Sequence, residues 1–356
     1  MTTFTTAAPS VPAARGPLSE SVRGTLLTVF RGSGWRSPRP GAEPRISLSE
    51  QPRADLDFDG LADADPLGDD LQLALHLCYE LHYQGLPGVS ADWEWDPELL
   101  RLRGALESRF LAALRENVAG GEDVTGELDG LLVEPLDAEG VSHFLRDHGD
   151  WTQVREYFVH RSVYHHKEAD PHAWVIPRLR GRAKAALVAV EFDEFGGGRA
   201  ECVHARLYAD LLRAAGLPDG YLELIDHAPG SMLAVVNMMS LFGLHRSLRG
   251  ALCGHFAAAE ITTAPSAQRM DQALRRLGAP EACRFFYTEH IEADAVHEQV
   301  MRHDVLGDLL EQEPELAADV VFGIQATEFL EGRFGTQLLD SWRAGRSSLR
   351  QPLPAG

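Results

Sequence analysis

The chain has 356 residues, 44% of them hydrophobic, so it is long enough for one large domain or two ordinary ones with a real core. Its 33 basic and 53 acidic residues give a formal net charge of −20, which disfavours nucleic-acid and membrane-surface partners because both are anionic. No apolar stretch approaches the roughly 18 residues of a membrane-spanning helix, and the four cysteines form no CxxC pair. These features predict a cytoplasmic protein without a disulfide framework or a zinc–thiolate site.

The first forty residues differ in composition from the rest of the chain. They contain five arginines and a single acidic residue, Glu20, among many Ser, Thr, Ala, Pro and Gly residues. Such a segment can imitate an organelle transit peptide, but its composition favours a flexible tail. Together with the acidic stretch that follows, it predicts a tail and linker over residues 1–64.

Helical patterns then continue almost to the end of the chain. Asp96-Pro97 places Pro at the first position of a helix, and apolar residues follow at helical spacing as far as Leu114. Further helices are predicted at 71–84, 151–167, 178–195, 199–215, 219–227, 231–262, 266–277, 280–303 and 314–344. Because no alternating run is bounded by hairpin turns, we expect one all-α domain over residues 65–345 and a flexible C-terminal tail at 346–356.

The strongest chemical signal lies in the segment 284–300. His290, Asp294 and His297 stand at i, i+4 and i+7, which places two imidazoles and a carboxylate on one face of a helix. This arrangement is typical of half a metal site. The alternative is a solvated polar face, because several glutamates surround these residues.

A second group of candidate ligands surrounds three consecutive glycines at 196–198. In an unbroken helix Glu194 and His204 would lie about 15 Å apart along the axis, too far to share an ion. A break at the glycines would allow Glu194 to turn back toward His204. Glu201 is a rival, because Glu201 and His204 form the i, i+3 pair of carboxylate-bridged di-iron bundles. The glycines could also simply separate two helices, leaving His204 in the core.

Two further carboxylates are candidates. Glu260 is the single acid in an apolar, small-residue helix, and a buried carboxylate usually has a cation or metal nearby. His255 lies five residues earlier on a different face and is expected to pack in the core or behind the ligands. Glu168 belongs to a His-rich stretch at 164–174 that favours a helix end with salt bridges, although Glu168 could reach a metal.

Together these residues resemble the haem-oxygenase-like di-iron oxidases and oxygenases, often called iron-containing redox enzymes. The resemblance covers roughly residues 150–305 and implies a haem-oxygenase-like helical bundle, here with extra N-terminal helices over 71–147. The family pattern has a Glu and a His on one core helix, a Glu on the second, and His-x3-Asp-x2-His on the third. It falls on Glu194, His204, Glu260, His290, Asp294 and His297, with Glu168 in the place of an additional mobile carboxylate and Glu201 as the alternative to Glu194.

The resemblance implies two iron ions, or manganese, with O2 as co-substrate and no catalytic residue beyond the metal ligands. Mixed imidazole and carboxylate ligands suit these metals. The expected activity is N-oxygenation, or C–H oxidation or desaturation, of a small organic substrate. An external electron donor and a homodimer are possible partners. Aromatic and Met residues at helical spacing are expected to be core, so none is assigned to substrate binding.

Three other functions remain open at this point. A true haem oxygenase needs a proximal His and would not explain the spaced acids. Iron storage in a ferritin-like bundle would require two Glu-x-x-His motifs, whereas the chain has one Glu-x-x-His and one Asp-x-x-His. The third alternative is a helical interaction module that binds no metal. It would not explain why residues of the types that bind metals occur at these spacings.

Overall fold

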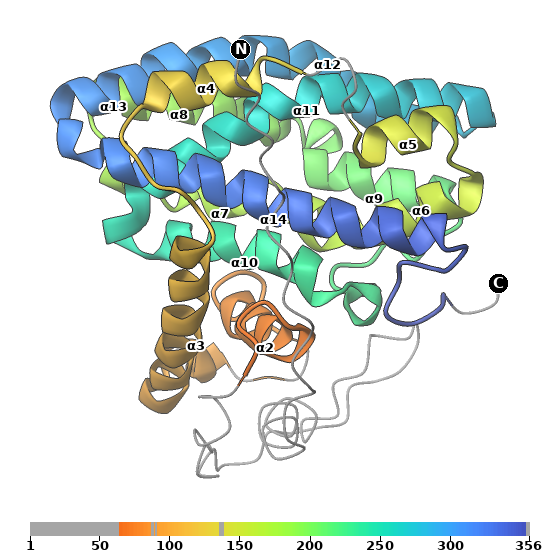
Figure 1. Ribbon diagram of the computed structural model, residues 1–356, viewed down its shortest axis with the longest axis horizontal. Coiled ribbons are helices and arrows are strands. Elements are labelled where there is room, and N and C mark those ends of the chain that lie inside the picture. Colours follow the sequence, from red (N-terminus) through yellow and green to blue (C-terminus); the bar gives the residue numbers. More distant parts are fainter. Residues whose placement is uncertain (1–63, 87–88, 90, 135–138, 354–356) are drawn as a thin grey trace, which may run out of the picture.

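The computed structural model describes residues 64–86, 89, 91–134 and 139–353, with the side chains of 292–295 outside that description. Within these ranges the structure is helical and contains no strand, as the sequence predicts (Figure 1). The predicted tail at 1–64 lies almost entirely outside the described residues. Along the described part of the chain, no helix combines the length and apolarity needed to cross a membrane.

The longer helices are α2 (Asp69–Glu80), α3 (Pro97–Glu116), α6 (Trp151–His165), α8 (Gly181–Glu194), α9 (His204–Ala214), α10 (Gly230–Leu244), α11 (Arg249–Leu277), α12 (Glu281–Gln299) and α14 (Ala317–Arg343). Shorter α-helices are α4 (Val124–Leu131), α5 (Val141–Asp147), α7 (Asp170–Ala173) and α13 (Gly307–Gln312). A π-helix, η8 (Val300–Leu306), continues α12. Single 3-10 turns are η2 (Ala91–Trp95), η3 (Ile176–Arg178), η4 (Gly196–Gly198), η5 (Ala200–Cys202), η6 (Ile225–His227), η7 (Arg246–Leu248) and η9 (Pro314–Leu316).

Three of the predicted helices differ in the structure. The segment 219–227 forms turns and η6 instead of a helix, and Leu222 there has a φ of +58°. The predicted helix 231–262 is two helices, because His245 is extended between α10 and η7. Conversely, α11 continues through Pro265 and includes the segment 266–277, which was predicted as a separate helix.

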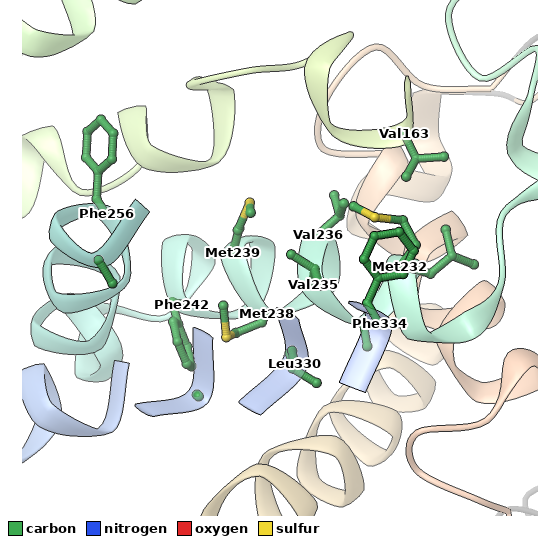
Figure 2. Packing of buried hydrophobic residues seen from close by; sticks show 14 of the residues in the cluster. Val163, Met232, Val235, Val236, Met238, Met239, Phe242, Phe256, Leu330 and Phe334 are labelled. Atoms are coloured by element: carbon green, nitrogen blue, oxygen red, sulfur yellow. The ribbon is translucent and has the colours of Figure 1, made fainter. Parts of the chain in front are cut away.

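Helix α10 lies at the centre of the core. All its residues from Gly230 to Gly243 are buried, as expected for a helix that is apolar on every face. Figure 2 shows its side chains packed between those of α6, α11 and α14: Met232, Val235, Val236, Met238, Met239 and Phe242 of α10 lie near Val163, Phe256, Leu330 and Phe334. Asn237, also on α10, accepts a hydrogen bond from His76 Nδ1 and donates one to the Gln72 carbonyl oxygen, which attaches α2 to the core.

Helices α11 and α14 approach each other closely through glycines. A Cβ atom on Gly254 would lie 2.2 Å from the Val320 carbonyl oxygen, and one on Gly323 would lie 2.0 Å from the Ala251 carbonyl oxygen. Only residues without a side chain fit at these crossings. The close approach sets the relative position of the side chains one turn further along each helix.

Part of the predicted C-terminal tail packs on the bundle. Ser348 is buried, and its backbone N–H and its hydroxyl both donate to Glu156 of α6 at 2.9 and 2.7 Å. Trp342 Nε1 donates to the same carboxylate. The buried Glu156 thus obtains its hydrogen-bond donors from the end of the chain, which lies against α6 over these residues.

Candidate metal centre

Two groups of buried imidazole and carboxylate side chains lie beside each other in the bundle. One comprises Glu168, His204 and His290, and the other comprises Glu194, Glu260 and His297. Within each group the possible ligand atoms lie within 4.8 Å of one another. The structure therefore brings together six of the eight candidate residues, which come from five separate segments of the chain.

The glycine turn explains how Glu194 and His204 meet. Glu194 is the last residue of α8 and His204 is the first residue of α9. Gly196, Gly197 and Gly198 between them all have positive φ values, which glycine adopts without strain. The chain reverses there, and Glu194 Oε2 lies 2.8 Å from His204 Nδ1.

Glu194 also connects the two groups. Its other carboxylate oxygen, Oε1, lies 3.7 Å from His297 Nδ1, while Glu260 Oε2 lies 3.2 Å from the same nitrogen. The rings of His204 and His290 have centroids 4.5 Å apart. One carboxylate thus faces a histidine of each group, which is the position that a bridging ligand would occupy.

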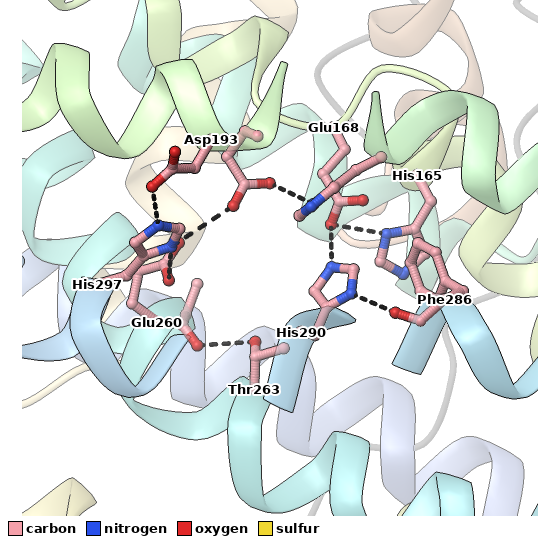
Figure 3. Close-up of polar contacts among 11 residues, drawn as sticks. His165, Glu168, Asp193, Glu260, Thr263, Phe286, His290 and His297 are labelled. Atoms are coloured by element: carbon pink, nitrogen blue, oxygen red, sulfur yellow. Dashed lines mark hydrogen bonds and ion pairs between the residues drawn. The ribbon is translucent and has the colours of Figure 1, made fainter. Parts of the chain in front are cut away.

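Glu168 lies in the turn after α6, and Ala169 beside it has a φ of +70°. The Glu168 Oε1 atom is 2.9 Å from His165 Nδ1 and 3.6 Å from His290 Nε2 (Figure 3). Although burial tends to raise the pKa of Glu168, these two histidines hold it well below its usual value. This carboxylate is therefore held in its charged form at the first group.

Two contacts orient the imidazoles of α12. His290 Nδ1 donates to the Phe286 carbonyl oxygen at 2.7 Å, which leaves its Nε2 lone pair facing Glu168. His297 Nε2 lies 3.2 Å from Asp193 Oδ2, which leaves Nδ1 facing Glu194 and Glu260 (Figure 3). A carbonyl or carboxylate on the second ring nitrogen is the usual support of a metal-binding histidine.

The remaining candidates occupy different positions. Asp294 lies on α12 between His290 and His297, but its side chain is outside the described residues. Glu201 is exposed on η5 and belongs to neither group. The contributions of Asp193 and His165 were not predicted, although Asp193 adjoins Glu194 and His165 precedes Glu168 by one helical turn.

Several carboxyl groups in and beside the two groups are buried and crowded together. Burial and the neighbouring Glu194 raise the pKa of Glu260, although His297 opposes this shift. Burial and the charges of Glu194, Asp170 and Glu260 raise the pKa of Glu191 to about 9. Burial would lower the pKa of His297, but the surrounding carboxylates raise it to about 9. Buried carboxyl groups crowded in this way either hold a proton or have a compensating cation nearby, so the donor set fits metal ions.

A cavity of about 360 Å³ adjoins both groups. Glu168, Glu194, Glu260 and His290 contribute to its wall, together with side chains of α6, α11, α12 and α14. Tyr157 and Tyr164 line it, whereas Met238 and Phe242 belong to the packed core. The arrangement can hold a small molecule beside the candidate ligands.

Comparison with known proteins identifies the family of the chain. A family model described as iron-containing redox enzyme matches residues 155–332. The chain is also similar to a nitrosourea synthase of Streptomyces achromogenes subsp. streptozoticus, with 23% identity over 233 residues that cover 63% of this chain and 50% of that protein. It thus spans about half the length of this relative. The chain belongs to the iron-containing redox enzyme family, and its all-α architecture is the haem-oxygenase-like bundle of that family.

Proposed function

We propose that the protein is a non-haem di-iron oxidoreductase that uses O2 to oxidise a small organic molecule in the adjoining cavity. The observation that carries this proposal is the pair of buried imidazole–carboxylate groups with Glu194 between them. Membership of a redox family that contains iron supports the choice of metal. Imidazole and carboxylate ligands also suit manganese, which we retain as the alternative ion.

In the proposed centre, Glu168, His204 and His290 would hold one ion, and Glu194, Glu260 and His297 the other. Asp294 stays in the proposed set because its position on α12 lies between the two histidines. The contact of Glu194 with His204 and the exposure of Glu201 favour Glu194 as the ligand that precedes α9. When bound, two ferrous ions would supply electrons to O2 and the oxidising power for the substrate.

In this proposal, residues around the ligands orient them, and the cavity positions the substrate. The Phe286 carbonyl and Asp193 fix which nitrogen of His290 and His297 faces the ions. His165 holds the carboxylate of Glu168 at the first group. The cavity would place the reacting atom of the substrate beside the ligands. An external reductant would return the ions to the ferrous state.

We propose nitrogen oxidation as the reaction, and C–H oxidation or desaturation as the second candidate. The similarity to a nitrosourea synthase favours nitrogen, because the product named there contains an oxidised nitrogen. Amines, amino acids and fatty acids are the substrate classes to screen.

The deciding experiment is anaerobic loading with Fe(II), followed by metal analysis and O2 consumption with the substrate panel. We expect two irons per chain and O2 consumption that increases with a substrate. His290→Ala and Glu260→Ala should lose both properties, whereas Glu201→Ala, at an exposed position, should keep them. One iron per chain would contradict the dinuclear centre, and iron uptake without substrate-dependent O2 consumption would indicate a non-catalytic iron-binding protein. No metal uptake at all would favour a helical interaction module, and an absorbance band typical of haem would favour a true haem oxygenase.

A further inference from the structure

The cavity has a polar wall that the proposed metal centre does not use. Besides the metal-facing residues, its lining includes polar side chains of α6, α11 and α14: Arg161, His255, Thr327, Glu328 and Glu331. These residues can contact a bound molecule without contacting the metal ions. Their charges and hydrogen bonds therefore determine which kinds of molecule the cavity accepts.

The charge of Arg161 is already neutralised. Its Nη1 and Nη2 atoms donate to the two carboxylate oxygens of Glu331, each at 2.7 Å, and its Nε donates to the Tyr157 hydroxyl. Among the described lining residues, Arg161 is the one with a permanent positive charge. No second lining cation is thus present there to bind the carboxylate or phosphate of a ligand.

The same wall carries an additional negative charge. Glu328 is exposed and lines the cavity from the middle of α14. Burial of part of its side chain and the nearby Glu127 raise its pKa. A positively charged ligand would be attracted to this wall and an anionic one repelled.

The hydrogen bonds of Thr327 determine which ring nitrogen of His255 can accept a hydrogen bond. The Thr327 hydroxyl donates to the Gly323 carbonyl oxygen at 2.8 Å, so its oxygen accepts the hydrogen bond from His255 Nδ1, also at 2.8 Å. With the ring proton on Nδ1, Nε2 carries a lone pair. His255 is 1% exposed, and this nitrogen has no hydrogen-bond partner among the described residues. Burial lowers the pKa of His255 to about 4, so the ring stays neutral.

The helix packing makes this pair rigid. Gly254 precedes His255, and Gly323 lies one turn before Thr327, and both glycines lie where the backbones of α11 and α14 approach closely. The approach that only glycine permits there is what brings the threonine hydroxyl to the imidazole. The packing of α11 against α14 therefore determines which nitrogen of His255 carries the proton.

We propose that His255, oriented by Thr327, is a specificity residue that accepts a hydrogen bond from an N–H of an organic ammonium or guanidinium ligand in the cavity. This inference rests on the proposed function, because it names the substrate class of the same site. It explains why a buried imidazole keeps one nitrogen without a protein partner. It also favours cationic nitrogen compounds over fatty acids in the substrate screen.

The first test measures the tautomer directly. The full-length chain with ¹⁵N-labelled histidine should show His255 protonated at Nδ1 and not at Nε2. Thr327→Val should change this signal, and Thr327→Ser, which keeps the hydroxyl, should restore it. Protonation of Nε2 in the unaltered protein would overturn the proposal.

The second test measures ligand binding by calorimetry on the anaerobically Fe(II)-loaded chain. The probes are n-butylammonium and butyrate, which have similar size and opposite charge. We expect binding of n-butylammonium but not of butyrate, and a loss of about tenfold in affinity in His255→Phe and Thr327→Val, the upper range for one hydrogen bond. Thr327→Ser and His255→Gln, which keep a hydroxyl and an acceptor, should bind within about threefold of the unaltered protein.

Metal analysis of the same samples separates this proposal from the proposed function. Absence of iron in the unaltered protein would contradict the metal centre alone. Two irons with equal binding of butyrate, with no binding of n-butylammonium, or with full affinity in Thr327→Val would contradict the role of His255. Thr327→Val nearly keeps the shape of threonine without its hydroxyl, and Thr327→Ser keeps the hydroxyl, so this pair decides the question even if His255→Phe fails to fold.

Discussion

Glu194 and His204 are ten positions apart in the sequence, yet their side chains lie 2.8 Å apart in the structure. The turn of Gly196, Gly197 and Gly198 makes this contact possible because it reverses the chain between α8 and α9 within a few residues. The three glycines differ in how closely they approach other parts of the chain. All have positive φ, but Gly196 also lies against backbone, since a Cβ there would be 2.7 Å from the Cys202 carbonyl carbon.

Replacing glycines of this turn should therefore have graded effects. Gly197→Ala introduces strain from its φ of +60° but meets only Phe192 at 3.8 Å, so we expect a loss of about 1 kcal/mol in the free energy of unfolding. Gly196→Ala adds the backbone clash and should lose about 3 kcal/mol or more, together with Fe(II) affinity.

Denaturant unfolding and Fe(II) titration of both variants check this ranking. Gly104→Ala in α3 is the matched control, because a Cβ there meets nothing within 4 Å and alanine favours a helix interior. It should stabilise the protein by about 0.5–1 kcal/mol and leave iron binding unchanged. Equal stability of Gly196→Ala and Gly197→Ala would contradict the proposed role of the backbone contact.

The two acids near the glycine turn should differ in their effect on metal binding. Glu194→Gln removes the carboxylate between the two groups and should weaken Fe(II) binding by more than about tenfold. Glu201→Gln changes the same functional group on the exposed η5 and should leave both stoichiometry and affinity unaltered. Anaerobic titration followed by metal analysis measures both. A larger effect of Glu201→Gln would reverse the assignment of the ligand.

Local sequence patterns predicted the elements that depend on neighbouring residues. Asp96 caps α3 with Pro97 in the first turn, and Asp150 caps α6 by accepting from Gln153 N. His290 and His297 share a helix, as their spacing indicates. These features need only helical periodicity and capping chemistry, which a short window of sequence contains.

Features that depend on distant segments could not be predicted in this way. The extended residue His245 separates α10 from α11 although both flanks have helical patterns. Glu168 approaches His290 because Ala169 adopts a positive φ, which no residue type there signals. The pairing of His255 with Thr327 requires the close crossing of α11 and α14, so neither residue alone indicates it.

A buried ion pair next to the candidate centre leads to a prediction about stability. Lys167 Nζ contacts Glu80 of α2, and both side chains are fully buried. Tyr221 OH also donates to Glu80, at 2.6 Å. Lys167→Met would leave the carboxylate without its cation and should lower the free energy of unfolding by about 3–5 kcal/mol.

The double variant Lys167→Met with Glu80→Gln should regain at least half of that loss, because no uncompensated charge remains. Arg101→Met is the matched control, since Arg101 and Glu98 form an exposed pair on α3. It should change stability by less than about 1 kcal/mol. Denaturant unfolding of the three variants tests the comparison, and a double variant as unstable as Lys167→Met would show that the charge is not the cause.

The pH dependence of stability should depend in part on His160, which lies on α6 away from the candidate ligands. Its ring is fully buried against Phe334, and Nε2 donates to the Ser348 hydroxyl, which itself donates to Glu156. Burial lowers the pKa of His160 from 6.5 to about 3, so the unfolded chain takes up this proton first. The contribution is complete above about pH 6.5 and is lost at about 1.4 kcal/mol per unit as the pH falls toward 3.

His160→Gln can keep the hydrogen bond to Ser348 without the titrating ring. Between pH 7 and pH 5 its free energy of unfolding should therefore fall by about 2 kcal/mol less than that of the unaltered protein. His148→Gln is the control for the substitution itself, because His148 is exposed. Urea unfolding at the two pH values measures the difference. If His160→Gln and the unaltered protein lost the same stability on acidification, the buried imidazole would not be a source of the acid sensitivity.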